Sequence, residues 1–330
     1  MPVTSVVTNT ESLTLTVVAD FTVPVSRLWD AYADPRQIEK FWGPPEFPAT
    51  FLRHDFAPGG RSSYRMTGPN GEISSGYWDW VAVDEARSFE VRDGFADEEG
   101  NPNTALPDMR MVFEFTETAL GSRLTTTTWF ASLDELEQLK EMGMEVGMRA
   151  AMGQIDAIVE DLTAYAAGQG TELQLIGNNQ ARVSRVIRGD APQVWRAYTE
   201  PELLQRWLLG PDGWTMPVCE FEAEAGSRYR YEWEESGGAN RFGFTGEVLE
   251  VAPRVRLVTT EAMTTPENPD GAGSAQTLNE LTFTPVSGGT LLSLLITYPD
   301  TKLREQILAT GMVDGMETSY ERLEELALSA

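Results

Sequence analysis

Cysteine, histidine and lysine are scarce in this chain: Cys219 is the one cysteine, His54 is the one histidine, and three lysines occur among 330 residues. A single cysteine cannot form an internal disulfide, which agrees with a reducing compartment. One histidine and one cysteine cannot supply the clustered ligands that zinc requires, so we expect no metal or other cofactor. No pairing of a histidine with a serine or cysteine recurs along the chain, so we expect no catalytic residues.

Long apolar runs and an excess of positive charge are missing as well. No run of about 18 apolar residues occurs, and the first residues, MPVTSVVTNTES, lack the basic and then apolar pattern of a signal peptide. We therefore expect a cytoplasmic protein. The formal charge of 25 − 51 = −26 repels phosphate backbones and anionic lipid headgroups, so we expect neither a nucleic acid nor a membrane as partner.

What the chain does contain is a copy of itself. The segment VSRLWDAYADPRQIEKFWGP (25–44) returns as APQVWRAYTEPELLQRWLLGP (191–211) with a shift of 166 residues. FAPGGRSSYRM (56–66) returns as AEAGSRYRYEW (223–233) with a shift of 167, and GMEVGM (143–148) returns as GMVDGM (311–316) with a shift of 168. This pattern indicates a tandem duplication with its boundary in 164–173, and hence two domains, 1–167 and 172–330.

Both halves predict the same order of elements. An extended segment (12–23 or 180–189) precedes two short helices (26–33 and 35–41, or 192–199 and 201–208). Strand-like runs with turn signals follow, including Asn70-Gly71 of the hairpin type. A long amphipathic helix closes each half (136–165 or 303–328). We expect an α+β domain in which the long helix covers an antiparallel sheet of six or seven strands.

This order and its motifs resemble the START-like (SRPBCC) superfamily, and within it the branch of activator of heat-shock-protein-90 ATPase homologues. The motifs are the tryptophan- and proline-punctuated opening, the Pro/Ala-Gly-Gly/Ser-Arg turn and the Gly-Met-x-x-x-x-Met helix. The resemblance covers the whole chain, once per half. It implies two tandem helix-grip (Bet v-like) domains, each a curved sheet that grips the long helix around a cavity for an apolar molecule.

Strand parity and the long helices propose which side chains line such cavities. Alternating residues place Leu52, His54 and Phe56 on the inward face and Arg53 and Asp55 on the solvated one. Ordinary core packing is the alternative for each inward residue. The proposed ligand-binding residues of the first half are Trp42, His54, Tyr64, Met66, Trp78, Met111, Phe113, Met144 and Met148. Those of the second half are Trp207, Trp214, Phe221, Tyr231, Trp233, Phe244, Met312, Met316 and Tyr320.

Glycine and methionine mark the first turns of both long helices. Gly143, Gly147, Gly311 and Gly315 are costly within a helix, so their matched positions predict a packing reason. The methionines beside them make an adaptable surface. We expect each pocket at the N-terminal half of the long helix and solid core at its C-terminal half.

Three functions remain open from the sequence. The first is non-enzymatic binding of a small apolar molecule, lipid-like or aromatic, in each domain. The second is a protein-interaction module akin to the chaperone ATPase activator, with a chaperone as possible partner. The third is an enzyme like the polyketide cyclases and aromatases, in which His54, Tyr64 and Tyr231 are the acid–base candidates.

Overall fold

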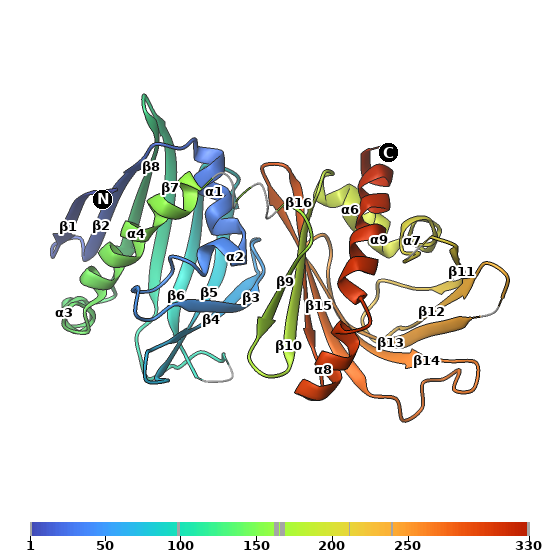
Figure 1. Ribbon diagram of the computed structural model, residues 1–330. Coiled ribbons are helices and arrows are strands. Elements are labelled where there is room, and N and C mark those ends of the chain that lie inside the picture. Colours follow the sequence, from blue (N-terminus) through green and yellow to red (C-terminus); the bar gives the residue numbers. More distant parts are fainter. Residues whose placement is uncertain are drawn as a thin grey trace. The chain divides into compact units, whose positions relative to one another are not determined.

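The structure is a computed structural model that describes residues 2–97, 100–161, 165, 169–210, 212–238 and 240–328. The chain divides into two compact units, Met1–Thr163 and Ala164–Ala330, which we call domain 1 and domain 2 (Figure 1). Part of the expected boundary segment, residues 164 and 166–168, lies outside the described residues.

Domain 1 is one antiparallel sheet covered on one face by helices. Its elements are β1 (Val3–Asn9), β2 (Thr14–Phe21), α1 (Val25–Ala33), α2 (Pro35–Ile38), β3 (Ala49–His54), β4 (Arg61–Thr67), β5 (Ile73–Asp84), β6 (Ser88–Ala96), β7 (Met109–Thr118), β8 (Gly121–Trp129), α3 (Leu133–Glu141) and α4 (Met144–Glu160). The strand order is β1-β2-β8-β7-β6-β5-β4-β3.

Domain 2 repeats this plan. Its elements are β9 (Glu172–Ile176), β10 (Gln180–Ile187), α6 (Ala191–Thr199), α7 (Pro201–Trp207), β11 (Trp214–Glu220), β12 (Arg228–Glu235), β13 (Arg241–Ala252), β14 (Arg256–Thr264), β15 (Gln276–Val286), β16 (Gly289–Thr297), α8 (Thr301–Leu308) and α9 (Met312–Leu328). The strand order is β11-β12-β13-β14-β15-β16-β10-β9. The expected fold class is confirmed, but each sheet has eight strands rather than six or seven, because β1 and β9 add an outer strand that pairs with the next.

The helices grip the sheet over an aromatic core. In Figure 1, α4 crosses the sheet of domain 1 and α9 crosses that of domain 2. In domain 1 the ring of Trp29 on α1 packs edge-on against Phe56 and Phe115, with centroids 5.2 and 5.3 Å away. Phe89 and Phe113, on neighbouring strands, stack with centroids 4.4 Å apart. Such aromatic pairs stabilise a protein by more than the apolar area they bury, so these rings strengthen the core of domain 1.

The long helix of each domain is two helices rather than the continuous one predicted. Gly143 lies between α3 and α4 with φ +88°, and Gly311 lies just before α9 with φ +81°. Only glycine adopts this left-handed conformation readily, so these two residues turn the chain. A Cβ on Gly147 or Gly315 meets no atom within 4 Å. The packing reason predicted for the four glycines is therefore wrong.

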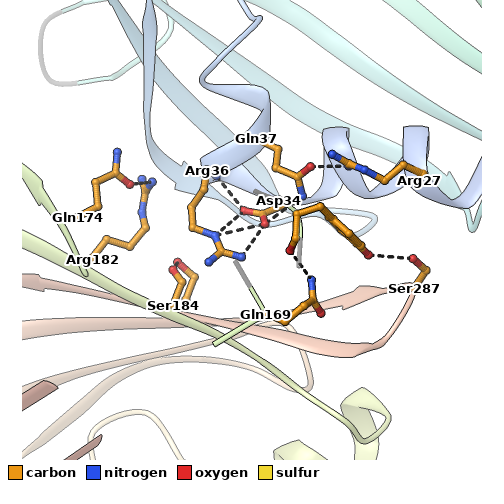
Figure 2. A network of polar contacts seen from close by, with 11 residues as sticks. Arg27, Asp34, Arg36, Gln37, Gln169, Gln174, Arg182, Ser184 and Ser287 are labelled. Atoms are coloured by element: carbon orange, nitrogen blue, oxygen red, sulfur yellow. Dashed lines mark hydrogen bonds and ion pairs between the residues drawn. The ribbon is translucent and has the colours of Figure 1, made fainter. Parts of the chain in front are cut away.

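The junction between α1 and α2 is fixed by Asp34, the N-cap of α2 (Figure 2). Its carboxylate accepts the backbone N–H of Arg36 at 2.9 Å and the Arg36 guanidinium at 2.7 Å. Gln37 also donates to Asp34, and Arg27 donates to Gln37 and to the carbonyl of Ile158 on α4. This network ties the short helices to the C-terminal part of the gripping helix.

Candidate functional site: a carboxyl inside each helix grip

A β-bulge changes which residues of β3 face the helices. The register shifts between Phe51 and Arg53, so Phe51 pairs with Tyr64 and His54 pairs with Ser62. Phe51 therefore lies inward in the place expected for Leu52, because the bulge inserts one residue. Asp55, expected on the solvated face, is buried and accepts from Arg53 at 2.5 Å.

In domain 1, the carboxyl of Asp93 on β6 lies on the gripped face. It follows the buried residues Phe89 and Val91 at alternate positions. Its Oδ1 accepts from Trp78 Nε1 at 2.7 Å and from the Tyr64 hydroxyl at 3.3 Å. Burial raises the pKa of Asp93 to about 7, while the two hydrogen bonds act in the opposite direction. Asp93 itself keeps some solvent-accessible surface.

Glycine gives Tyr64 access to that carboxyl. Tyr64 pairs with Gly76 on β5, and Gly76 has its neighbour Trp78 on the same face. A Cβ on Gly76 would lie 2.4 Å from the Tyr64 hydroxyl oxygen. The Tyr64 ring therefore lies over Gly76 of β5, where no side chain blocks its path. Burial and then Asp93 raise the pKa of Tyr64 well above its ordinary value.

Domain 2 carries a carboxyl at the matching place. Glu261 on β14 follows Asp93 by 168 residues and lies inward in the same way. Its Oε2 is 3.5 Å from the Tyr229 hydroxyl, which also donates to the Thr260 carbonyl at 2.8 Å. Burial raises the pKa of Glu261 to about 7, and hydrogen bonds from Asn279 and Tyr229 act in the opposite direction. The Asn279 amide is oriented by Thr277, whose hydroxyl donates to Asn279 Oδ1 at 3.0 Å.

One more polar group accompanies Glu261. Tyr298 follows β16, is 1% exposed, and its hydroxyl has no hydrogen-bond partner within the described chain. Burial and then Glu261 raise the pKa of Tyr298 to about 12. Its counterpart 168 residues earlier, Phe130, has no hydroxyl. The two grips therefore hold equivalent acids among different donors.

The gripping helix is more open at its first turns than at its later ones. Met144 and Met148 of α4 are half-buried, whereas Ile155 and Val159 are 0% exposed. In α9, Met312 and Met316 are half-buried, and Leu323 is 0% exposed. In both domains the later turns of the gripping helix contribute packed core residues, as predicted, and the methionines of its first turns keep accessible surface. Leu162 and Ala330, placed on the same stripes by the sequence, lie outside the described residues.

The carboxyl and the methionines of domain 1 lie at the same end of the sheet. Asp93 pairs with Met109 at the start of β7, and Trp129 at the end of β8 leads directly into α3 and α4. The other end of α4 lies at the far end of the strands, where Thr22 donates to Glu160 at 2.7 Å. In domain 2 Tyr298 belongs to a small hydrophobic cluster against which Met312 packs. Met312 therefore lies beside Tyr298.

The residues proposed for domain 1 divide into packed and accessible ones. Trp42 lies against Trp78 and Tyr64, with ring centroids 4.6 and 6.1 Å away, and so joins the carboxyl site. The buried members are His54, Tyr64, Trp78, Met111 and Phe113, and the half-buried ones are Trp42, Met66, Met144 and Met148.

His54 is held inside the core rather than turned to a ligand. Its Nε2 lies 2.9 Å from the carbonyl of Tyr32, so Nε2 carries the proton and donates. Its Nδ1 lies 2.9 Å from the Ser62 hydroxyl, which in turn accepts from Trp80 Nε1. Both ring nitrogens are engaged by the fold, which supports a structural role for this histidine.

The residues proposed for domain 2 form a continuous aromatic surface. Trp233 stacks on Phe242 at 5.3 Å, Phe244 lies 5.7 Å from Trp233, and Trp214 lies 5.2 Å from Phe242. The buried members are Trp207, Tyr231, Trp233 and Tyr320, and the half-buried ones are Trp214, Phe221, Phe244, Met312 and Met316.

A separate groove of about 490 Å³ lies near the C-terminal turns of α9, lined by Arg206, Arg322, Glu325 and Leu326. Arg322 in it donates to Asp212 and to the carbonyl of Gly210. The groove is polar, and it is not at the methionine end of the helix.

Sequence reasoning missed Asp93, Glu261 and Tyr298. A signal was present: the alternation Phe89, Val91, Asp93 puts an acid at an inward position, and the repeat puts Glu261 at the same place. A group of three or more metal-ligating side chains is not found within the described residues. Among the helices described, none is both long and apolar enough to cross a membrane.

These features define a tandem protein of two helix-grip domains, the architecture of START-like proteins. The sequence pattern of the family described as Activator of Hsp90 ATPase homolog 1-like protein matches residues 22–160 and again 190–327. The chain belongs to this family, as its motifs suggested.

Similar solved structures correspond to about half of this chain. Protein Ms6760 from Mycobacterium smegmatis is 51% identical, covers 48% of this chain and 98% of its own, and has a TM-score of 0.46. A protein from Arthrobacter aurescens is 39% identical over 48% of this chain and 92% of its own, with a TM-score of 0.46. One from Rhodobacter sphaeroides is 29% identical over 48% and 98%, with a TM-score of 0.43. No curated protein matches the chain.

Proposed function

We propose that each domain binds a small, largely apolar molecule between its sheet and its gripping helix, without catalysing a reaction on it. The observation that carries this proposal is the burial gradient along α4 and α9. The inward methionines of the first turns are half-buried in both domains, whereas the residues two to three turns later are fully packed. A gripped face that is closed at one end and accessible at the other fits a ligand site.

The chemistry of the accessible end favours an apolar ligand. In domain 2 it presents the half-buried rings of Trp214, Phe221 and Phe244. Aromatic faces and flexible methionines provide a large contact area that adapts to shape. The acidic carboxyl in each grip then supplies one polar contact, as is usual in pockets that bind small molecules.

The proposal is tested by titrating the full chain with N-phenyl-1-naphthylamine, an uncharged dye that fluoresces in apolar surroundings. Met148→Trp and Met316→Trp fill the accessible ends of α4 and α9, so each is expected to weaken dye binding at least about fivefold in its own domain. Val7→Trp, at an exposed position on the outer face of β1, is the control and leaves binding unchanged. Absence of dye binding, or equal binding by all three variants, would contradict the proposal.

A further inference from the structure

The acid of domain 2 keeps some solvent-accessible surface, and no cation of the described chain neutralises it. Glu261 has neutral partners, Tyr229 and Asn279, and no basic side chain of the described chain forms an ion pair with it. A buried charge is ordinarily paired, because desolvation of an isolated carboxylate is costly. This site therefore lacks a positive group.

The basic residue that acts on Tyr298 is already engaged. Arg304 on α8 influences Tyr298 electrostatically. Its guanidinium donates to the carbonyls of Gly177 and Gln180, at 3.0 and 3.2 Å. Arg304 thus serves the turn between β9 and β10.

Tyr298 provides a second, independent sign of a missing partner. Its hydroxyl is buried and is unpartnered within the described chain. Glu261 pairs with Thr277, and the next residue, Leu278, pairs with Thr297, which places Tyr298 level with Glu261 across β15. A buried hydroxyl without a hydrogen bond is rare, because it forfeits the bonds it had in water. Parity puts it on the gripped face, since it continues the inward series of Leu292, Leu294 and Ile296.

On this geometry we propose that the ligand of domain 2 carries a protonated amine, which binds between the Glu261 carboxylate and the Tyr298 hydroxyl while its apolar part lies along Met312 and Met316. The inference rests on the proposed function and specifies its ligand class. An ammonium group has several N–H donors and no acceptor, so it can donate to Glu261 and to Tyr298 at once. The rings of Tyr229 and Tyr298 favour a cation further.

Domain 1 has a carboxyl group at the equivalent position, but its neighbouring residues differ. Asp93 lies among Tyr64, Trp78 and Trp42, and Trp42 Nε1 is buried without a hydrogen bond of proper geometry. The position of Tyr298 is taken there by Phe130. The amine preference of domain 2 is therefore measured in an Asp93→Asn background, so that domain 1 does not contribute a second acidic site.

The test compares octylamine, octanol and octanoate by isothermal titration calorimetry at pH 8. The expected result is that octylamine binds at least about tenfold more tightly than octanol, and that octanoate binds more weakly than either. Glu261→Gln should bring the octylamine affinity down to that of octanol and leave octanol unchanged. Glu247→Gln, on an exposed position of β13, is the matched control and keeps the preference.

A second variant and a pH series keep the test decisive if Glu261→Gln does not fold. Tyr298→Phe removes only the hydroxyl and should lower octylamine affinity about threefold. Octylamine affinity should rise between pH 6 and 8, because Glu261 ionises over this range. The groups that act on Glu261 or on Tyr298 are Tyr229 on β12, Asn279 on β15 and Arg304 on α8.

The outcomes separate the two proposals. If octanol and octylamine bind equally, or Glu261→Gln leaves octylamine binding unchanged, the amine proposal is overturned and the apolar site remains. If none of the three compounds binds, the proposed function fails, and the amine proposal fails with it.

Discussion

The Tyr229 hydroxyl lies 3.5 Å from Glu261 Oε2, on the far side of a glycine. A Cβ on that residue, Gly246, would lie 2.8 Å from the Tyr229 ring. Domain 1 has a similar arrangement two residues further along the strands, where Tyr64 crosses Gly76 to reach Asp93. Each grip therefore holds an acid that a tyrosine approaches across a strand without a side chain.

The glycine beneath Tyr64 should be essential to this arrangement. We expect Gly76→Ala to lower the free energy of unfolding by about 2–3 kcal/mol, since the new methyl group overlaps the phenol ring and forces it to move. Urea denaturation followed by tryptophan fluorescence measures this. Gly153→Ala in α4 is the control: its methyl group meets no atom within 4 Å, so it should stabilise by up to about 1 kcal/mol. Equal effects of the two substitutions would contradict the account.

The buried acids should make stability fall as pH rises. The pKa values of Asp93 and Glu261 in the folded protein are raised to about 7, from 3.8 and 4.5. The stability gained by holding these protons is fully present below pH 4 and is lost as the pH rises through 7. Asp93→Asn and Glu261→Gln should therefore raise the free energy of unfolding at pH 8, on the order of 1–3 kcal/mol each, and change it little at pH 5.

The control for this pH series is Asp79→Asn. Asp79 lies on the other face of β5 and pairs with Arg61 at 2.7 Å. Its substitution should shift stability by a similar amount at both pH values. Chemical denaturation at pH 5 and pH 8 checks all three variants. The same pH dependence in wild type and in the Asn and Gln variants would be evidence against desolvated carboxyls.

The two ends of the gripping helix should respond differently to truncation. Ile155→Ala removes a fully buried side chain and should cost about 3–4 kcal/mol. Met144→Ala, at the half-buried end of the same helix, should cost only about 1 kcal/mol. Thermal and urea unfolding give the two values. A larger loss at Met144 than at Ile155 would mean that the accessible end is in fact the tighter one.

The break before α9 should depend on glycine alone. Gly311 has φ +81°, so Gly311→Ala should destabilise domain 2 by about 1 kcal/mol. Gly315→Ala, four residues later, places a methyl group in open space within a helix and should stabilise by about 0.5–1 kcal/mol. Opposite signs in urea denaturation are the expected result. Stabilisation by both substitutions would show that the helix can run through Gly311.

The repeat made the fold predictable, because two copies of one pattern confirm each other. The tryptophan that returns as Trp29 and Trp195, and the matched hairpins, gave the same element order in both halves, and the structure has it. The prediction of a continuous long helix was wrong, because periodicity alone does not show that Gly143 and Gly311 have positive φ. The inward position of Leu52 was wrong for a similar reason: a β-bulge depends on pairing with the next strand, which parity within one strand cannot reveal.

The candidate site was only half predictable. Apolar and aromatic lining residues follow from alternation, and the methionines followed from the helix stripe. Asp93 and Glu261 were missed because a charged residue in a strand is ordinarily assigned to the solvated face. Their inward direction depends on the sequence around them, and their partners come from strands far away in the chain, such as Asn279 on β15.

NMR with ¹³C-methyl-labelled methionine is the decisive measurement for an apolar site at the methionine end of each gripping helix. During titration with octylamine, the methyl signals of Met144, Met148, Met312 and Met316 should shift or broaden together. Met142, which is exposed, serves as the internal control and should stay in place. A shift confined to Met142, or no shift at any methionine, would contradict the claim.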